Sequence, residues 1–204
     1  MRTSRDLSRH AFTDAALWFV QTSACVRGRW DQPGLGEWDV RALVGHTSRA
    51  LLTIEAYLAR PAHAVDVATA ADYFKATTAE AAGPDVAARG RMAGVALGTD
   101  PHGAVEEIAA RVLGLVHASD GRELLTTIVG GMRLRDYLPS RTFELVVHTA
   151  DLCTALGVPP NPPDTAATQA LGVVSDLAVS GGLAGPLLLA ATGRTTLPAA
   201  FTVL

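Results

Sequence analysis

The stretch from about Leu134 to Leu156 predicts a single long helix that is apolar on nearly every side. Gly157 follows it, a residue typical of the position just after a helix, and residues 159–163 read Pro-Pro-Asn-Pro-Pro, a stiff linker. A helix with apolar residues all round belongs in the interior of a protein. The other helices of this chain are therefore expected to pack around this one.

Polar side chains nevertheless follow one line along this helix. At about 100° per residue, Glu144, His148 and Asp151 fall on one stripe, with Arg141 beside them. An unpaired charge in the interior is very costly, so these groups need partners. A Glu and a His four residues apart lie about 6 Å from each other and can reach one metal ion. The alternatives are structural: a buried Glu144–His148 ion pair, a local bond for Asp151, and pairing of Arg141 with Glu144 or Asp136.

The remaining elements follow from apolar spacing, helix caps and prolines. We expect helices over 7–25, 40–58, 101–118 and 165–179, one further helix near 67–81, an extended connector or loop over 124–132, and a short apolar segment at 186–191. Asp39 and Asp100 are suited to cap the helices that begin at 40 and 101. Long helices with few strand signals predict an all-α four-helix bundle over residues 1–157. Residues 158–204 would add a linker, a helix and a tail packed on that bundle.

A third polar group comes from the helix over 40–58. His46 lies on its apolar face, which also carries Leu43, Ala50, Ile54 and Tyr57, and the adjacent Gly45 permits close approach of a neighbouring helix. If this helix packs against the one over 134–156, His46 meets Glu144 and His148. Two histidines and one glutamate with an open fourth position make a zinc site of the catalytic type. The structural alternative is a hydrogen-bonded core histidine.

Composition excludes several classes of protein. The net charge of −3 is unlike the basic charge of a nucleic-acid-binding protein. The most apolar stretch, 171–191, is interrupted by Asp176 and Pro186 and is unsuited to span a membrane. The first twelve residues lack the apolar core of a signal peptide. Cys25 and Cys153 form no disulfide framework, so we expect reduced thiols and a cytoplasmic location. Separately, we expect a monomer or homodimer. The sequence contains no recognisable Ser/His/Asp arrangement, and it contains neither a Walker motif nor a dinucleotide-binding glycine motif.

Two motifs resemble a known family. Residues 36–50 read Gly-Glu-Trp-Asp-Val-Arg-Ala-Leu-Val-Gly-His-Thr-Ser-Arg-Ala, and residues 141–152 carry the pattern Arg-x-x-Glu-x-x-x-His-x-x-Asp-Leu. Together, and with the ending at 187–198, they are similar to the mycothiol-dependent maleylpyruvate isomerase family of the DinB-like superfamily of helical bundles. The resemblance implies that His46, Glu144 and His148 match the three metal ligands of that family. Only about 40 residues follow Pro163, so the C-terminal domain of the longer family members is reduced here.

The resemblance implies a metal- and thiol-dependent enzyme that acts on a small unsaturated or electrophilic substrate. Its metal would be Zn²⁺ and its thiol a low-molecular-weight compound, with mycothiol suggested by the family; the reaction would be cis–trans isomerisation or thiol S-transfer. Arg141 is a candidate to hold a substrate carboxylate, and Asp151 a candidate partner for a metal ligand. Two alternatives use the same scaffold: a non-catalytic metal-binding module with a regulatory or ligand-binding role, and a hydrolase that uses a zinc-bound water.

Overall fold

The computed structural model describes residues 4–81 and 85–204, and the regular structure in this part of the chain is almost entirely helical. The helices are α1 (Ser4–Ala24), α2 (Val40–Leu58), α3 (Ala70–Ala81), α4 (Asp85–Ala96), α5 (Pro101–Ala118), α6 (Leu134–Leu156), α7 (Asp164–Ser180) and α8 (Ala184–Ala191), and the strands are β1 (Leu124–Thr127) and β2 (Gly130–Arg133). The all-α prediction is confirmed. Residues 1–3 and 82–84, which fall in the predicted bundle, lie outside the described part.

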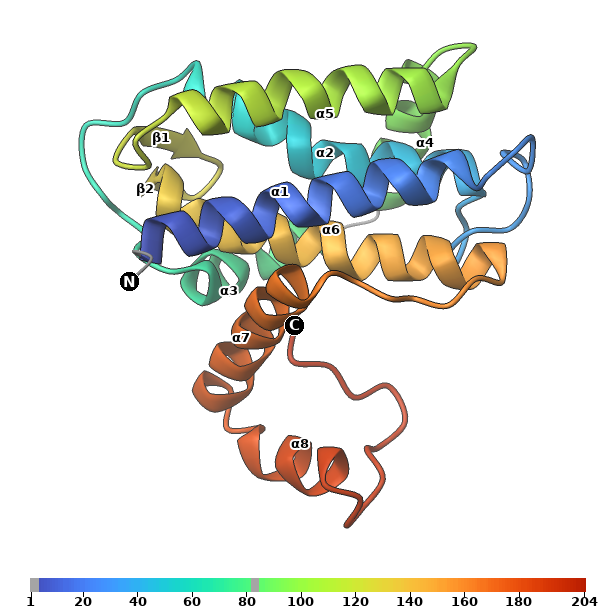
Figure 1. Cartoon of the computed structure of the whole chain (residues 1–204). Coiled ribbons are helices and arrows are strands. Elements are labelled where there is room, and N and C mark those ends of the chain that lie inside the picture. Colours follow the sequence, from blue (N-terminus) through green and yellow to red (C-terminus); the bar gives the residue numbers. More distant parts are fainter. Residues whose placement is uncertain (1–3, 82–84) are drawn as a thin grey trace.

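Four long helices, α1, α2, α5 and α6, lie side by side and form the body of the molecule (Figure 1). Helix α6 packs against both α1 and α2, and α5 closes the other side against the same two helices. Large side chains without solvent exposure fill the space between them, among them Phe12, Phe19, Leu51, Ile54 and Leu145. The helix that the sequence places in the interior, α6, therefore packs against α1, α2, α3 and α7.

The C-terminal elements continue from this body. Helix α7 packs against α1, α3 and α6, and the short helix α8 packs against α7 and extends away from the bundle (Figure 1). Within the described residues, no helix combines the length and the apolar character needed to cross a bilayer.

The predicted helix ends agree with the structure where a local signal marks them. The Asp39 side chain accepts a hydrogen bond from the Ala42 N–H at 2.7 Å, and that of Asp100 accepts one from the Gly103 N–H at 3.1 Å. Gly157 adopts the left-handed conformation, with φ at 68°, and ends α6. These caps satisfy backbone groups that a helix terminus leaves without partners.

The sequence predicts one helix between residues 62 and 100, whereas the structure contains two in this region, α3 and α4. Helix α4 lacks a strong apolar period, and its two internal glycines disfavour a helix on propensity alone. Both glycines lie at close contacts instead. A Cβ atom on Gly94 would come within 2.8 Å of the Arg41 carbonyl oxygen, and one on Gly45 would come within 2.2 Å of the Gly94 nitrogen. Helices α2 and α4 therefore approach each other so closely that only glycine fits at these positions. Gly45 permits the close approach of a neighbouring helix, as the sequence predicts.

The connector expected over 124–132 is an antiparallel hairpin, β1–β2, with Leu124 opposite Arg133. Each strand has only four residues, and its turn lacks the Asn-Gly or Asp-Gly signal of short hairpins. The hairpin is held by a segment distant in sequence: the Gly131 N–H donates to the Asp66 carboxylate at 2.7 Å. Strands this short can be recognised only from such tertiary contacts.

Candidate metal centre

The polar stripe of α6 forms a continuous chain of contacts. His148 Nε2 lies 3.2 Å from Glu144 Oε2, and His148 Nδ1 lies 3.1 Å from Asp151 Oδ2. The helical spacings of three and four residues bring these side chains together without help from any other element. His148 is therefore held between two carboxylates, each on a different ring nitrogen.

His46 reaches the same place from α2. Its ring centroid lies 4.8 Å from that of His148, and the two rings are nearly perpendicular. On its other side His46 contacts the Trp38 ring, with centroids 4.5 Å apart, and Trp38 Nε1 donates to the Ala87 carbonyl of α4 at 3.0 Å. A Cβ on Gly90 would overlap the Trp38 ring, at 2.5 Å. Trp38 is thus wedged between α4 and His46 and fixes the position of the imidazole.

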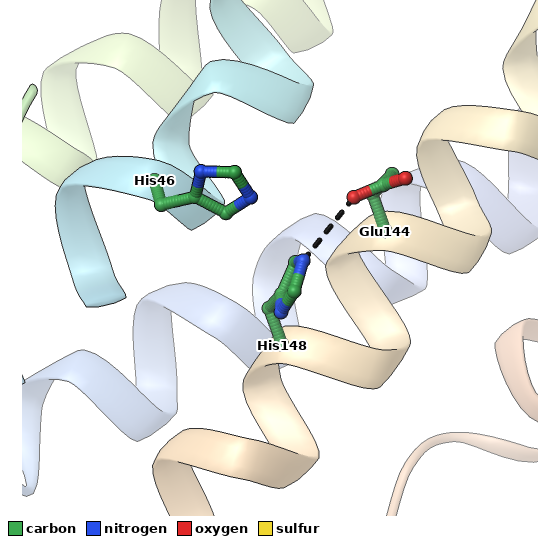
Figure 2. A group of neighbouring side chains, drawn as sticks. All are labelled: His46, Glu144 and His148. Carbon is green, nitrogen blue, oxygen red and sulfur yellow. Dashed lines mark ion pairs between the residues drawn. The ribbon is translucent and has the colours of Figure 1, made fainter. Parts of the chain in front are cut away.

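The structure brings His46, Glu144 and His148 into one cluster. One potential ligand atom from each lies within 4.8 Å of those of the other two. Figure 2 shows the three side chains directed toward one another across the space between α2 and α6. The Nδ1 atom of His46 is buried and has no hydrogen-bond partner among the residues that the structure describes. A donor set of two imidazoles and one carboxylate fits a divalent metal ion of the zinc type.

The charges of the cluster are set by burial and by the neighbours. Burial lowers the pKa of His46 to about 4, and the charge of His148 acts in the same direction. Burial alone would raise the pKa of Glu144, but the hydrogen bond from His148 and the charge of Arg141 lower it to about 2. Burial would lower the pKa of His148, yet its hydrogen bonds to Asp151 and Glu144 raise that pKa to about 9. At neutral pH the metal-free cluster therefore contains a neutral His46, an ionised Glu144 and a protonated His148.

Arg141 is buried one turn before Glu144 and is held by aromatic rings. Its guanidinium carbon lies 4.8 Å from the centroid of the Tyr137 ring and 5.2 Å from that of Tyr73, and its Nε donates to Ser140 Oγ at 3.1 Å. A desolvated guanidinium over aromatic faces is stabilised by cation–π attraction. The rings hold the charge of Arg141 beside the cluster in a fixed orientation.

A cavity of about 380 Å³ adjoins the cluster and is lined by Arg141, Glu144 and His46. Among the lining residues that the sequence analysis does not single out are Arg49 on α2, Arg89 on α4 and Ile128 at the hairpin turn. Arg49 follows His46 by three residues, so helical spacing alone could have placed it on the same face. Arg89 and Ile128 carried no such signal, because α4 and the hairpin were not predicted. The cavity is cationic and of a size for a small molecule.

Asp151 and the two cysteines lie apart from this cavity. Asp151 contacts the cluster through His148, on the side of the ring away from Glu144. Both cysteines are free thiols, Cys153 buried and Cys25 exposed. The metal candidates identified in the described residues include neither thiol.

Comparison with known proteins gives one result. A family model described as the mycothiol maleylpyruvate isomerase N-terminal domain matches residues 24–153, which is well over half of the chain. The matched range contains α2 and nearly all of α6, and with them every residue of the cluster. No curated protein and no solved structure matches the chain.

Proposed function

Because the chain belongs to the mycothiol maleylpyruvate isomerase N-terminal domain family, we propose that it is a metal- and thiol-dependent enzyme acting on a small unsaturated or electrophilic substrate. The observation that carries the proposal is the convergence of His46, Glu144 and His148 beside a cavity of about 380 Å³. We further propose that residues 1–157 form the metal-binding unit, with residues 158–204 as an extension packed on it.

His46, Glu144 and His148 would hold the metal, and zinc is the ion that suits two imidazoles and a carboxylate. When bound, such an ion favours the thiolate form of a small thiol, which is the nucleophilic form. The thiol is supplied from outside the chain, since Cys153 is buried away from the cluster and Cys25 is on the surface. The family name suggests mycothiol as that thiol.

Two reactions follow from a thiolate placed in this cavity. In isomerisation, the sulfur forms a bond to one carbon of an activated double bond, rotation occurs about the resulting single bond, and the same sulfur leaves with its electron pair. The thiol is regenerated, and the substrate changes only its geometry. In S-transfer, the carbon–sulfur bond remains and the neighbouring carbon takes up a proton.

The protein's own residues would bind and orient the reactants. Arg141 faces the cavity with a permanent charge fixed over two tyrosine rings, so it is suited to hold a substrate carboxylate. Asp151 acts through His148: its hydrogen bond to Nδ1 fixes the orientation of the ring and leaves Nε2 directed toward Glu144. We therefore assign a binding role to Arg141 and a positioning role to Asp151.

Metal content is the first test. Protein purified without added metal should contain about one divalent ion per chain by elemental analysis, and His46→Ala should lose most of it while keeping its helical circular dichroism. His63→Ala, which removes an exposed histidine, is the matched control and should retain the ion. If the metal-free wild-type protein cannot be loaded with a divalent ion, the proposed metal site is refuted.

Thiol dependence is the second test. Cobalt-loaded protein should change its visible absorption when a small thiol is added, and it should convert unsaturated carboxylic acids only in the presence of that thiol. Arg141→Lys should raise KM for such acids much more than it lowers metal content, because Lys keeps the charge and loses the planar fork. Ester hydrolysis without any thiol would instead favour a metal-dependent hydrolase. Metal binding without turnover would favour a non-catalytic module.

A further inference from the structure

Among the three candidate ligands, only His46 has no hydrogen bond within the part of the chain that the structure describes. The His148 ring is held by the Asp151 carboxylate, which lies 3.1 Å from its Nδ1 atom. The Nδ1 atom of His46 is buried without a partner, although the ring extends from α2 toward Glu144 and His148 (Figure 2). A metal-binding histidine is normally oriented by a hydrogen bond to its second ring nitrogen. Another contact must therefore fix the orientation of His46.

The Trp38 ring supplies that contact. It is buried, its centroid lies 4.5 Å from that of the His46 ring, and the two planes are inclined by 34°. Aromatic rings at this separation attract each other beyond the effect of the area they bury. Stacking on Trp38 thus takes the place, for His46, of the hydrogen bond that Asp151 makes to His148.

Trp38 is itself held from two sides. Its backbone lies in the loop before α2, where its N–H donates to the Leu35 carbonyl at 2.9 Å and its carbonyl accepts from the Gly34 N–H at 2.8 Å. Its indole N–H donates to the Ala87 carbonyl of α4, and a Cβ atom on Gly90 of α4 would lie 2.5 Å from the ring. The ring therefore cannot move away from His46 unless α4 moves too.

Helix α4 has few other anchors. It packs against α2, and within residues 86–96 its only buried residues are Gly90 and Gly94. Its large apolar side chains Met92 and Val95 are exposed. An element that buries so little apolar surface opens at a lower free energy than the protein as a whole. Docking of α4 on α2 is therefore an equilibrium that a small free-energy change can shift.

We propose that Trp38 is a positioning residue of the metal centre and that it makes metal affinity depend on the docking of α4. Docked α4 holds the Trp38 ring against His46, so the imidazole is already oriented when the ion arrives. When α4 opens, the ring loses its contacts with Ala87 and Gly90, and His46 is free to turn. The same docking places Arg89 in the wall of the cavity beside the cluster.

Two binding equilibria that are coupled in this way affect each other equally. If docking of α4 raises the affinity for the ion, the ion stabilises docked α4 by the same factor, although α4 contributes none of the three candidate ligands. The inference rests on the proposed metal site and on no particular thiol, substrate or reaction. Wild-type protein that binds no divalent ion would overturn both proposals, whereas normal zinc binding with the variants unaffected would overturn this one alone.

The first experiment measures zinc affinity by competition with a chelator, with circular dichroism as the check on folding. Trp38→Leu should weaken zinc binding about 10–100-fold, the usual effect of losing a residue that orients a metal ligand. Trp38→Phe keeps an aromatic face and should recover part of that loss. Trp30→Leu makes the same change at a tryptophan that contacts Arg41, and should leave zinc affinity unchanged. Equal affinity in Trp38→Leu and wild type, or an equal loss in Trp30→Leu, would overturn the proposal.

Gly90→Ala tests the same contact without altering Trp38, and it decides the question if Trp38→Leu does not fold. The added methyl group overlaps the indole ring, so either the ring or α4 must move. Zinc affinity should fall several-fold. Val112→Ala removes buried methyl groups from α5 and is the control for reduced stability, with unchanged zinc affinity expected. Equal effects of the two substitutions, or no effect of Gly90→Ala, would contradict the role of the α4–Trp38 contact.

Hydrogen exchange measures the reciprocal effect without any enzymatic assay. Saturating zinc should slow exchange of the α4 amides in wild-type protein, and should slow it much less in Trp38→Leu. Helix α8, which extends away from the bundle, is the internal control and should exchange at the same rate with and without zinc (Figure 1). If zinc slows exchange in α2 and α6 but leaves α4 unchanged, the coupling is refuted. If zinc protects α4 equally in Trp38→Leu, Trp38 does not carry the coupling.

Discussion

Binding of a metal ion to the cluster should release one proton, and this proton comes from His148. In the metal-free protein His148 is a cation between Glu144 and Asp151, with a pKa of about 9. A histidine ligates a metal only in its neutral form, so the ion must displace that proton. The other two ligands contribute none near neutral pH, because the pKa of His46 is lowered to about 4 and that of Glu144 to about 2.

The expected magnitude follows from this count. Between pH 6 and 8, one displaced proton makes the apparent affinity rise about tenfold per pH unit, hence about 100-fold in total, or roughly 2.7 kcal/mol. The rise should flatten as the pH approaches the pKa of His148, near 9. Cooperative release of more protons would give a steeper dependence.

The assay is competition between the protein and a chelator of known affinity at several pH values. Calorimetry in two buffers of different ionisation enthalpy counts the released protons directly. Asp151→Asn removes one of the two carboxylates that raise the pKa of His148, so the plateau should begin at a lower pH. Asp31→Asn, at an exposed position in the loop before α2, is the matched control and should not move it.

Two results would refute the reasoning. An affinity that stays constant between pH 6 and 8 would mean that His148 is neutral in the metal-free protein or is not a ligand. Release of two protons would mean that a further acidic group, such as a cysteine thiol, enters the ligand set. A shift of the plateau in Asp31→Asn as large as that in Asp151→Asn would mean that the effect is a general one of net charge.

Three further predictions concern stability and the thiols. Gly45→Ala should lower the free energy of unfolding by about 1–3 kcal/mol in chemical denaturation, since the new Cβ would overlap the α4 backbone; an unchanged midpoint would show that the helices separate freely. The metal-free protein should be most stable near pH 6.5. Stability falls toward pH 4 because the lowered pKa of His46 favours protonation of the unfolded chain, and it falls toward pH 9 as His148 loses its proton, by at most about 3 kcal/mol on that side. A free energy of unfolding that rises steadily with pH across this range would contradict these pKa shifts. The double variant Cys25→Ser/Cys153→Ser should keep its metal content, and loss of metal would make a thiol a ligand.

The parts of this protein that the sequence determined are those governed by neighbouring residues. The caps at Asp39 and Asp100 and the left-handed Gly157 were predictable because each acts within a few residues of its own helix end. The alignment of Glu144, His148 and Asp151 was equally local, since helical geometry alone fixes spacings of three and four residues. Short-range rules therefore align two of the three candidate ligands, Glu144 and His148, before any packing is known.

Long-range packing decided the rest. His46 meets Glu144 and His148 only because α2 packs against α6, and Trp38 is fixed over His46 only because Gly90 lets α4 approach. Helix α4 itself could not be recognised, because its glycines disfavour a helix in isolation, and the contacts that need them, with α2 and with Trp38, form only in the tertiary structure. The hairpin and its Ile128, like Arg89, reach the cavity through contacts distant in sequence. Close approach of two backbones depends on both partners at once, so no single stretch of sequence contains the information that places them.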